Sequence, residues 1–304
     1  MSIIESRVAA GLLGLGFDTI SNINGIVQRN FPGETWGRSL LSNIFLSDLS
    51  TPNHIAFRLD RQYDGNNTDK GSFDIGTFAP GFEAVNNTAK IPIFTTHPDQ
   101  NIYWTVLVDG IAINGVNQTL QTTITNGTIP PSGKLPAVLD TGFSLPQIPQ
   151  QIAAAIYEPM GGLFDQGSGQ YIVPCEAQAN LTLYIGGYTI PIHPLDLSLV
   201  DVATANNQNR TVCYGAFQPW QSQAGGGLVD LILGDSFLRN TYTVYDFGDF
   251  VEGTSGAVRQ DPYVKLLPLT DPGAASIEFQ TARKAQLAGL PPQVNGSATT
   301  LSAL

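Results

Sequence analysis

The amino-acid sequence predicts an all-β fold. Most of the chain consists of short segments rich in β-branched and aromatic residues, the composition that strands favour. Turn dipeptides separate these segments. Of the 304 residues, 42% are hydrophobic, which is enough to bury a sizeable core. The clearest predicted strands span residues 54–59, 71–78, 101–115, 181–192 and 241–247, and the clearest turns are Asp64-Gly65, Asn114-Gly115, Asn126-Gly127 and Gly186-Gly187.

Helical patterns are few and short. Residues 149–158 combine helix formers with a stop at Pro159, and residues 23–30 follow a cap at Ser21 or Asn22. A single helical turn is expected at 236–239. Beyond residue 270 the composition shifts to Ala, Gln, Ser and Pro. We therefore expect residues 271–304 to form a flexible tail with at most a brief helix at 281–288.

Composition and charge exclude several classes of function. Charged residues make up only 13% of the chain, and the net charge is −11. An acidic surface repels phosphate backbones, which excludes nucleic-acid binding. No apolar stretch is long enough to span a membrane. His54, His97 and His193 lack metal-site spacing, and neither a nucleotide-binding loop nor a serine-hydrolase turn is present. We expect no cofactor and no metal.

Glycosylation sequons indicate a secreted protein. Seven N-x-[ST] sites in one chain favour the oxidising secretory pathway, where Cys175 and Cys213 could pair. Such a bridge would close a loop of nearly 40 residues and contribute about 4 kcal/mol. In a reducing compartment Cys175 and Cys213 would be two unrelated buried thiols. The glycosylation candidates are Asn66, Asn86, Asn117, Asn126, Asn180, Asn209 and Asn295.

The N-terminal residues do not resemble a secretion leader, although residues 8–17 are apolar. We interpret Gly11, Gly14 and Gly16 as parts of a tight buried β segment, and expect the chain to begin inside a domain.

Three segments carry the chemical signal. In the first, residues 137–144, an apolar strand leads into Asp140-Thr141-Gly142, followed by Phe143 and Ser144. The second spans residues 228–239 and contains Ile232-Leu233-Gly234, and the third spans residues 11–17 and contains Leu12-Leu13-Gly14. An Asp-Thr-Gly triplet alone is also a common turn, so the combination of the three segments is the informative feature.

Together, and in this order, the three segments resemble the pepsin-like (family A) aspartic proteases, particularly the fungal secreted members. That family has two lobes, each with an Asp-Thr-Gly loop crossed by a strand that ends hydrophobic-hydrophobic-Gly. Leu12-Leu13-Gly14 is similar to the crossing strand of the N-terminal lobe, and Ile232-Leu233-Gly234 to that of the C-terminal lobe. Cys175 and Cys213 match the spacing of the disulfide in the C-terminal lobe. The resemblance runs from about residue 11 to 267.

The resemblance implies a pepsin-like bilobal fold and acid endopeptidase activity. Two aspartates share a proton across a bound water, and a peptide or protein substrate lies extended between the lobes. Asp140 would be the second catalytic aspartate. Thr141 would brace the paired loops, and Gly142 would donate its N–H to the carboxylate. Phe143 departs from the family, which carries a hydroxyl there. We expect the full-length protein to act as a monomer.

The first catalytic aspartate is expected upstream of this sequence. Gly234 follows Asp140 by 94 residues, and the same interval before Gly14 falls ahead of Met1. Asp18-Thr19-Ile20 lacks the required glycine, Asp109 lies inside a predicted strand, and Asp235 is expected to cap a short helix. The implied domains are an N-terminal-lobe remnant at 1–97 with unpaired strands, a complete catalytic lobe at 98–270 and the tail at 271–304.

Two alternatives remain open. The chain could be a non-catalytic, inhibitor-like binding module with a pepsin fold. It could also pair two Asp140 loops as a homodimer, although residues 1–97 would then have to fit at the interface.

Overall fold

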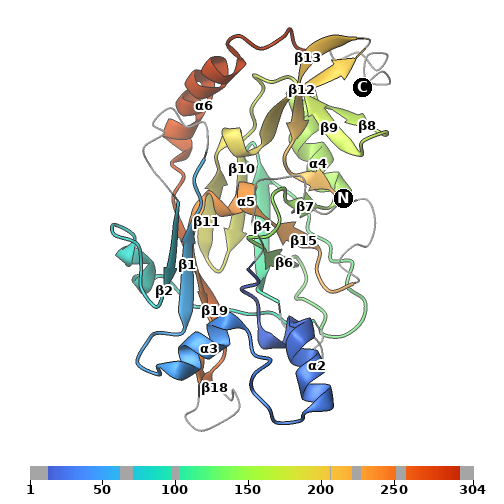
Figure 1. Ribbon diagram of the computed structural model, residues 1–304. Coiled ribbons are helices and arrows are strands. Elements are labelled where there is room, and N and C mark those ends of the chain that lie inside the picture. The colour runs from blue at the N-terminus through green and yellow to red at the C-terminus, as the bar shows by residue number, and fades with distance from the viewer. Residues whose placement is uncertain are drawn as a thin grey trace.

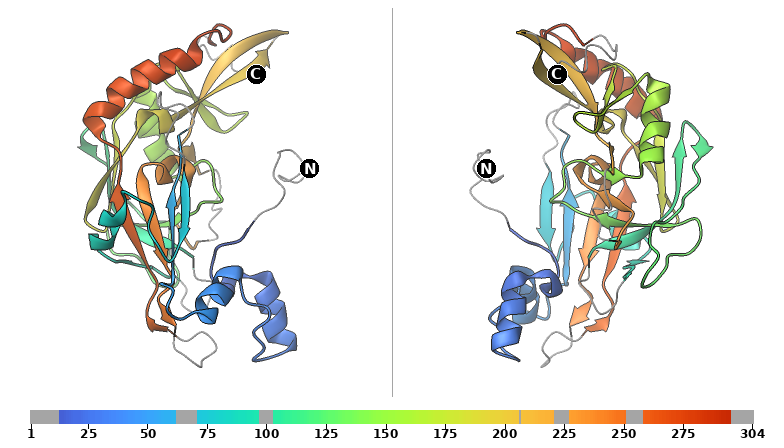
Figure 2. Two further views of the ribbon diagram at one scale, coloured as in Figure 1. Left: turned by 60° about the vertical axis from the view of Figure 1, so that its left-hand side comes forward. Right: turned by 90° about the vertical axis from the view of Figure 1, so that its right-hand side faces the viewer.

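The structure is a computed structural model, and it confirms the all-β fold class (Figure 1). Within the described residues, the strands form sheets of eight, five, four and two strands. The helices α2 (Asn22–Asn30) and α3 (Leu40–Ser47) lie at one end of the molecule, and the hairpin of β12 (Ser198–Ala205) and β13 (Gln208–Gly215) projects at the opposite end (Figure 2). The structure describes residues 13–61, 71–96, 103–205, 207–220, 227–250 and 258–294.

The eight-stranded sheet holds the predicted active-site loop. Its order is β11-β10-β4-β6-β15-β7-β14, and β5 pairs with β4. Asn114 and Gly115 join β4 to β5, and Gly186 and Gly187 join β10 to β11, all with positive φ as two-residue hairpins require. The strands are β4 (Thr105–Ile113), β5 (Val116–Asn117), β6 (Leu135–Leu139), β7 (Gln147–Ile148), β10 (Leu181–Ile185), β11 (Tyr188–Ile192), β14 (Gln218–Pro219) and β15 (Leu231–Leu233).

The five-stranded sheet joins the two ends of the chain. Its order is β2-β1-β16-β19-β3, so strands from before and after residue 97 lie in one sheet. The expectation of unpaired strands before residue 97 is wrong for β1, β2 and β3. Backbone N–H and C=O groups need partners, and β16 and β19 supply them to β1 and β3. The strands are β1 (His54–Arg58), β2 (Ser72–Ile75), β3 (Ile91–Pro92), β16 (Thr241–Asp246) and β19 (Tyr263–Pro268).

The four-stranded sheet, of order β12-β13-β9-β8, carries the predicted disulfide. Cys213 on β13 is bonded to Cys175, which follows β9, and the Cα atoms lie 5.2 Å apart. The predicted pairing is therefore confirmed. The strands of this sheet are β8 (Leu163–Asp165), β9 (Gln170–Val173), β12 (Ser198–Ala205) and β13 (Gln208–Gly215). The two-stranded sheet consists of β17 (Asp249–Phe250) and β18 (Val258–Gln260).

The predicted short helices are present with small shifts. The Ser21 side chain caps α2 by accepting from the N–H of Asn24, while α3, which we did not anticipate, is capped by Ser39. The helices are α2 (Asn22–Asn30), α3 (Leu40–Ser47), α4 (Gln150–Tyr157) and α5 (Asp235–Leu238), and the 3₁₀ turns are η1 (Asp18–Ile20), η2 (Glu83–Asn87), η3 (Glu158–Met160) and η4 (Pro194–Asp196).

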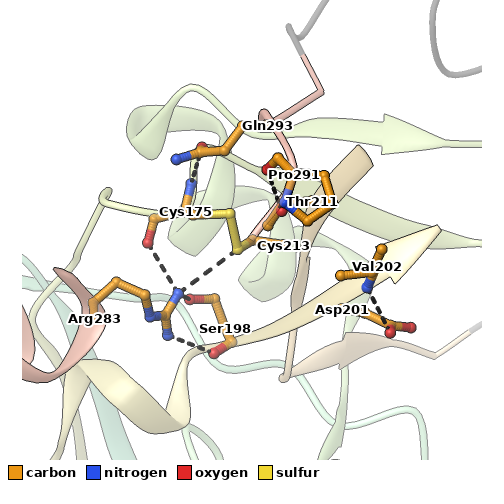
Figure 3. The surroundings of a disulfide bond; sticks show 9 residues. All are labelled: Cys175, Ser198, Asp201, Val202, Thr211, Cys213, Arg283, Pro291 and Gln293. Carbon is orange, nitrogen blue, oxygen red and sulfur yellow. Dashed lines mark hydrogen bonds between the residues drawn. A yellow bond between two sulfur atoms is a disulfide. The ribbon is translucent and has the colours of Figure 1, made fainter. Parts of the chain in front are cut away.

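The expected tail contains a long packed helix instead. Helix α6 (Pro272–Leu287) begins at an Asp271 cap and buries Ala275, Phe279, Ala282 and Arg283. The Arg283 guanidinium points at the disulfide (Figure 3) and donates to the carbonyl oxygens of Cys175 and Ser198, each at 2.9 Å. A flexible tail over 272–287 is therefore wrong. The sequence pattern was weak because the buried face of α6 consists of alanines, one phenylalanine and an arginine.

Candidate active site

The predicted catalytic loop lies at the end of two parallel strands. Strand β15 pairs with β6 in parallel, so that Leu233 lies opposite Leu139. Asp140 follows β6 directly, and Gly234 follows β15 directly. The two segments that the sequence singled out, 94 residues apart, therefore end side by side.

Backbone hydrogen bonds hold the loop to the segment that crosses it. The Asp140 N–H donates to the Leu233 carbonyl at 3.1 Å, and the Asp235 N–H donates to the Phe143 carbonyl at 2.8 Å. The Ser236 N–H donates to the Ser144 carbonyl oxygen at 3.3 Å. These bonds fix the loop at both ends and leave the Asp140 side chain at its rim.

Gly234 is required by the closeness of this crossing. A Cβ atom at this position would lie 1.8 Å from the carbonyl oxygen of Phe143, closer than any real contact. The backbone φ of −91° is ordinary, so the requirement comes from space rather than from conformation. This is the physical reason for a glycine at the end of Ile232-Leu233-Gly234.

The Asp140 carboxylate is held by its own loop. Its Oδ1 accepts from the Gly142 N–H at 2.8 Å, the contact that the resemblance implied. Asp140, Thr141 and Gly142 line an open cleft of about 360 Å³, whose other walls are largely apolar. Among the described residues lining this cleft, Asp140 is the only one with a carboxyl group. Phe143 and Ser144 lie outside the lining, and the Phe143 carbonyl oxygen accepts a hydrogen bond at the crossing.

Two aromatic residues in the cleft wall were not singled out as site residues. The Tyr245 and Trp104 rings meet edge to face, with centroids 5.1 Å apart, and both line the cleft. The Tyr245 hydroxyl lies 3.5 Å from the carbonyl oxygen of Leu139, the residue before Asp140. Burial first, and then the charges of Asp140 and Asp235, raise the pKa of Tyr245, so its hydroxyl remains a donor. The β-branched and aromatic residues along 241–247 predicted a strand, but nothing in that pattern indicated a place in the cleft wall.

Asp235 does not cap α5 as expected. The cap position is Gly234, held extended by the crossing, so the helix begins at Asp235 itself. Burial raises the pKa of the Asp235 carboxyl group to about 6; the nearby Arg239 opposes this shift and the charge of Asp140 adds to it. Asp235 is thus a second acidic group close to Asp140, although it does not line the cleft.

The N-terminal crossing segment has a different conformation from the one expected. Leu13, Gly14 and Leu15 line the cleft but form no strand, and Leu13 is 60% exposed. Leu12 lies outside the described residues. No neighbouring strand in the described part of the chain pairs with this segment. Asp18 begins a 3₁₀ turn, and its Oδ1 accepts from the Ser39 N–H at 2.8 Å, which fits a structural role.

The other polar residues have structural partners. The Asp109 carboxylate lies 2.6 Å from Lys134 Nζ and accepts from the Gly186 N–H, which fits a structural role. Burial lowers the pKa of His54, and lowers that of His193 to about 4. His97 lies outside the described residues. Within the described residues, no cluster of His, Cys, Asp or Glu could hold a metal ion.

The described sequon asparagines lie at the surface. Asn86, Asn117, Asn126, Asn180 and Asn209 are all exposed, as glycan attachment requires, while Asn66 and Asn295 lie outside the described residues.

Among the described helices, none combines the length and apolar composition needed to cross a bilayer.

Known proteins share this sequence pattern. The model of the family described as eukaryotic aspartyl protease matches residues 2–252. The chain is 28% identical over 246 residues to rhizopuspepsin-2 of Rhizopus niveus, covering 80% of the chain and 51% of the relative. It is 24% identical over 251 residues to aspartic protease pepA of Arthroderma gypseum, covering 80% and 53%, and 28% identical over 254 residues to vacuolar protease A of Aspergillus fumigatus, covering 81% and 52%. The chain thus spans about half the length of these curated relatives.

Proposed function

Because this chain belongs to the eukaryotic aspartyl protease family, we propose that Asp140 is one of the two catalytic aspartates of an acid endopeptidase. The observation that carries the proposal is the geometry of the loop. Asp140 accepts from the Gly142 N–H at the rim of an open cleft, and the segment ending in Gly234 anchors the loop from below.

The proposed reaction is hydrolysis of a peptide bond by water. One carboxylate of the pair takes a proton from the water as it attacks the scissile carbonyl carbon. The other, protonated carboxyl group donates a hydrogen bond to the carbonyl oxygen. The two acids share a proton because like charges so close together do not both ionise, the general behaviour of aspartic protease dyads. Thr141 braces the paired loops in this arrangement.

The second carboxyl group comes from a segment outside this sequence. Among the described residues that line the cleft, only Asp140 carries a carboxyl group. The carboxylate of Asp18 accepts from the Ser39 N–H, and that of Asp109 pairs with Lys134. The segment that supplies the partner aspartate also completes the N-terminal lobe, so that residues 1–97 belong to that lobe and residues 98–270 to the catalytic C-terminal lobe. Leu12, Leu13 and Gly14 would then form the second loop crossing.

The substrate is a peptide in an extended conformation. The apolar cleft wall, including Phe17, Ile55 and Trp104, suits apolar side chains, while backbone hydrogen bonds would hold the main chain. The disulfide and the exposed sequons support passage through the secretory pathway and an extracellular destination. The full-length protein acts as a monomer.

A non-catalytic binding module is the second candidate function. The single carboxylate in the described cleft favours it, because one aspartate can bind but lacks a partner to share the proton. The hydroxyl that the family usually carries at position 143 is also replaced by Phe143.

The test is to compare the 304-residue chain with the same chain extended by the coding sequence upstream of Met1. Both proteins are assayed on a denatured protein from about pH 2 to 6, with and without pepstatin. We expect no cleavage by the 304-residue chain and pepstatin-sensitive cleavage by the extended one. Cleavage by the shorter chain that is lost in Asp140→Asn would support a homodimer. Inactivity of both, or an upstream sequence without an Asp-Thr-Gly or Asp-Ser-Gly triplet, would favour the binding module.

A further inference from the structure

A second cavity of about 600 Å³ lies apart from the Asp140 cleft, and the two share no lining residue. It is formed by β4, β10, the segment that follows β5 and the loop that precedes β6, and we call it the β4–β10 cavity. Its volume lies in the range of small-molecule sites, about 300–1,000 Å³. The proposed protease function does not use it.

The wall of the β4–β10 cavity contains one aromatic ring. Tyr184 on β10 lies directly opposite Gly110 on β4. A Cβ atom on Gly110 would lie 3.1 Å from the Tyr184 ring, so the ring packs over the bare glycine backbone. Tyr184 is only partly buried, and its remaining surface lines the cavity.

Polar groups line the same cavity as this ring. The Asp109 carboxylate is fixed by Lys134 and by the Gly186 N–H, and its charge is neutralised by the lysine. Gln121 and Ser132 add groups that can both donate and accept hydrogen bonds. A sugar ring, with an apolar C–H face and hydroxyl groups around its edge, matches this combination. A dianionic ligand is disfavoured, because no described residue that lines the cavity is basic.

Asn117 also lines the cavity, and it begins the sequon Asn117-Gln118-Thr119. Asn117 is exposed at the end of β5, and Thr119 is exposed as well. A sugar attached here is tethered at the mouth of the cavity. Tethering gives it a high effective concentration, so that even weak contacts would keep it bound.

We propose that the first sugar residues of an N-linked glycan on Asn117 fold into the β4–β10 cavity and pack against Tyr184. The glycan is attached when the Asn117 amide nitrogen displaces the diphosphate of a lipid-linked oligosaccharide and loses a proton. The bound sugars link the β4–β5 hairpin to β10. This site is independent of Asp140 and of proteolysis.

The test measures how accessible the glycan is in the folded protein. The full chain is secreted from a eukaryotic host behind a heterologous leader and digested with peptide N-glycosidase under native conditions. Site-by-site removal is followed by peptide mass spectrometry. We expect the Asn117 glycan to be removed at least tenfold more slowly than the glycans on Asn126 and Asn180, which do not line the cavity. After denaturation the rates should be equal.

Two variants assign any protection to the cavity. Tyr184→Ala should abolish the protection, whereas Tyr184→Phe, which keeps the ring, should retain it. Gln121→Trp should fill the cavity from an exposed loop position and release the glycan, even if Tyr184→Ala fails to fold. An unmodified Asn117, or equal native removal rates at the three sites, would overturn the proposal. Protection that persists in Gln121→Trp would also overturn it.

Discussion

The backbone N–H of Asp140 donates to the carbonyl oxygen of Leu233 at 3.1 Å. This bond continues the parallel pairing of β6 with β15 by one residue, and it sets the position at which the loop leaves the sheet. The carboxylate of Asp140 therefore depends on a segment far away in the sequence. Changes in residues 231–236 should affect the site without touching the substrate.

Gly234→Ala tests the close crossing. The new Cβ would lie 1.8 Å from the Phe143 carbonyl oxygen, so the loop must move. We expect the free energy of unfolding, measured by urea denaturation, to fall by about 1–3 kcal/mol or more. Gly25→Ala in α2 is the matched control, because its Cβ meets no atom within 4 Å and alanine favours helix. Equal stability of the Gly234→Ala variant and the wild type would show that residue 234 does not lie so close to the Phe143 carbonyl oxygen.

Asp235→Asn should change how stability depends on pH. The folded-state pKa of Asp235 is raised to about 6, from 3.8, chiefly by burial. The folded protein therefore holds this proton more tightly than the unfolded chain, and stability falls as pH rises from about 4 to 6. The variant does not titrate at this position. It should gain stability relative to the wild type over this interval and show a constant difference above about pH 7.

Urea denaturation of both proteins at a series of pH values measures this difference. Subtracting the two curves removes the contributions of titrating groups that do not interact with Asp235. A difference that does not change between pH 4 and 7 would mean that Asp235 titrates normally.

Arg283→Met should loosen α6. The substitution leaves the carbonyl oxygens of Cys175 and Ser198 without their donor, although it also removes a buried charge. We expect a net loss of about 1–3 kcal/mol in unfolding free energy and faster amide exchange over 272–287. The neighbouring exposed Lys284→Met is the control and should have little effect. Unchanged exchange in Arg283→Met would contradict the proposed anchoring.

The disulfide makes a separate prediction. Thiol titration of the unfolded, unreduced protein should find no free thiol at Cys175 or Cys213. The double variant Cys175→Ser, Cys213→Ser should lose about 2–4 kcal/mol, since the unfolded chain is no longer constrained. Two reactive thiols before reduction would show that the bridge is not formed.

Local signals in the sequence predicted the turn of the active-site loop, whereas its crossing by Ile232-Leu233-Gly234 was expected from the family resemblance. Gly234 is required by the carbonyl oxygen of Phe143, which is distant in the sequence. The turn ending in Gly142 carries the reason for its conformation within the loop, because the Gly142 N–H donates to the Asp140 carboxylate. The cap at Ser21 and the hairpin turn at Asn114-Gly115 are local in the same sense. Such features need no knowledge of the rest of the fold.

Features that depend on distant partners were missed. The buried face of α6 became recognisable only from its contacts with the disulfide, and Arg283 is a poor signal for burial. The pairing of β1 with β16 brings residues 54–57 against 243–246, and no local pattern encodes that choice. The cleft wall of Trp104 and Tyr245 depends on the same long-range pairing.

The most direct test of the central claim is the rate of peptide hydrolysis by the extended protein carrying Asp140→Asn. The asparagine keeps the size of the side chain but cannot act as base or hold the shared proton. We predict a fall in kcat of at least about 10²–10⁴-fold between pH 2 and 6. Asp109→Asn, which changes a structural carboxylate outside the cleft, should retain activity. An Asp140→Asn variant that hydrolyses peptides at the wild-type rate would contradict the assignment of Asp140 as a catalytic aspartate.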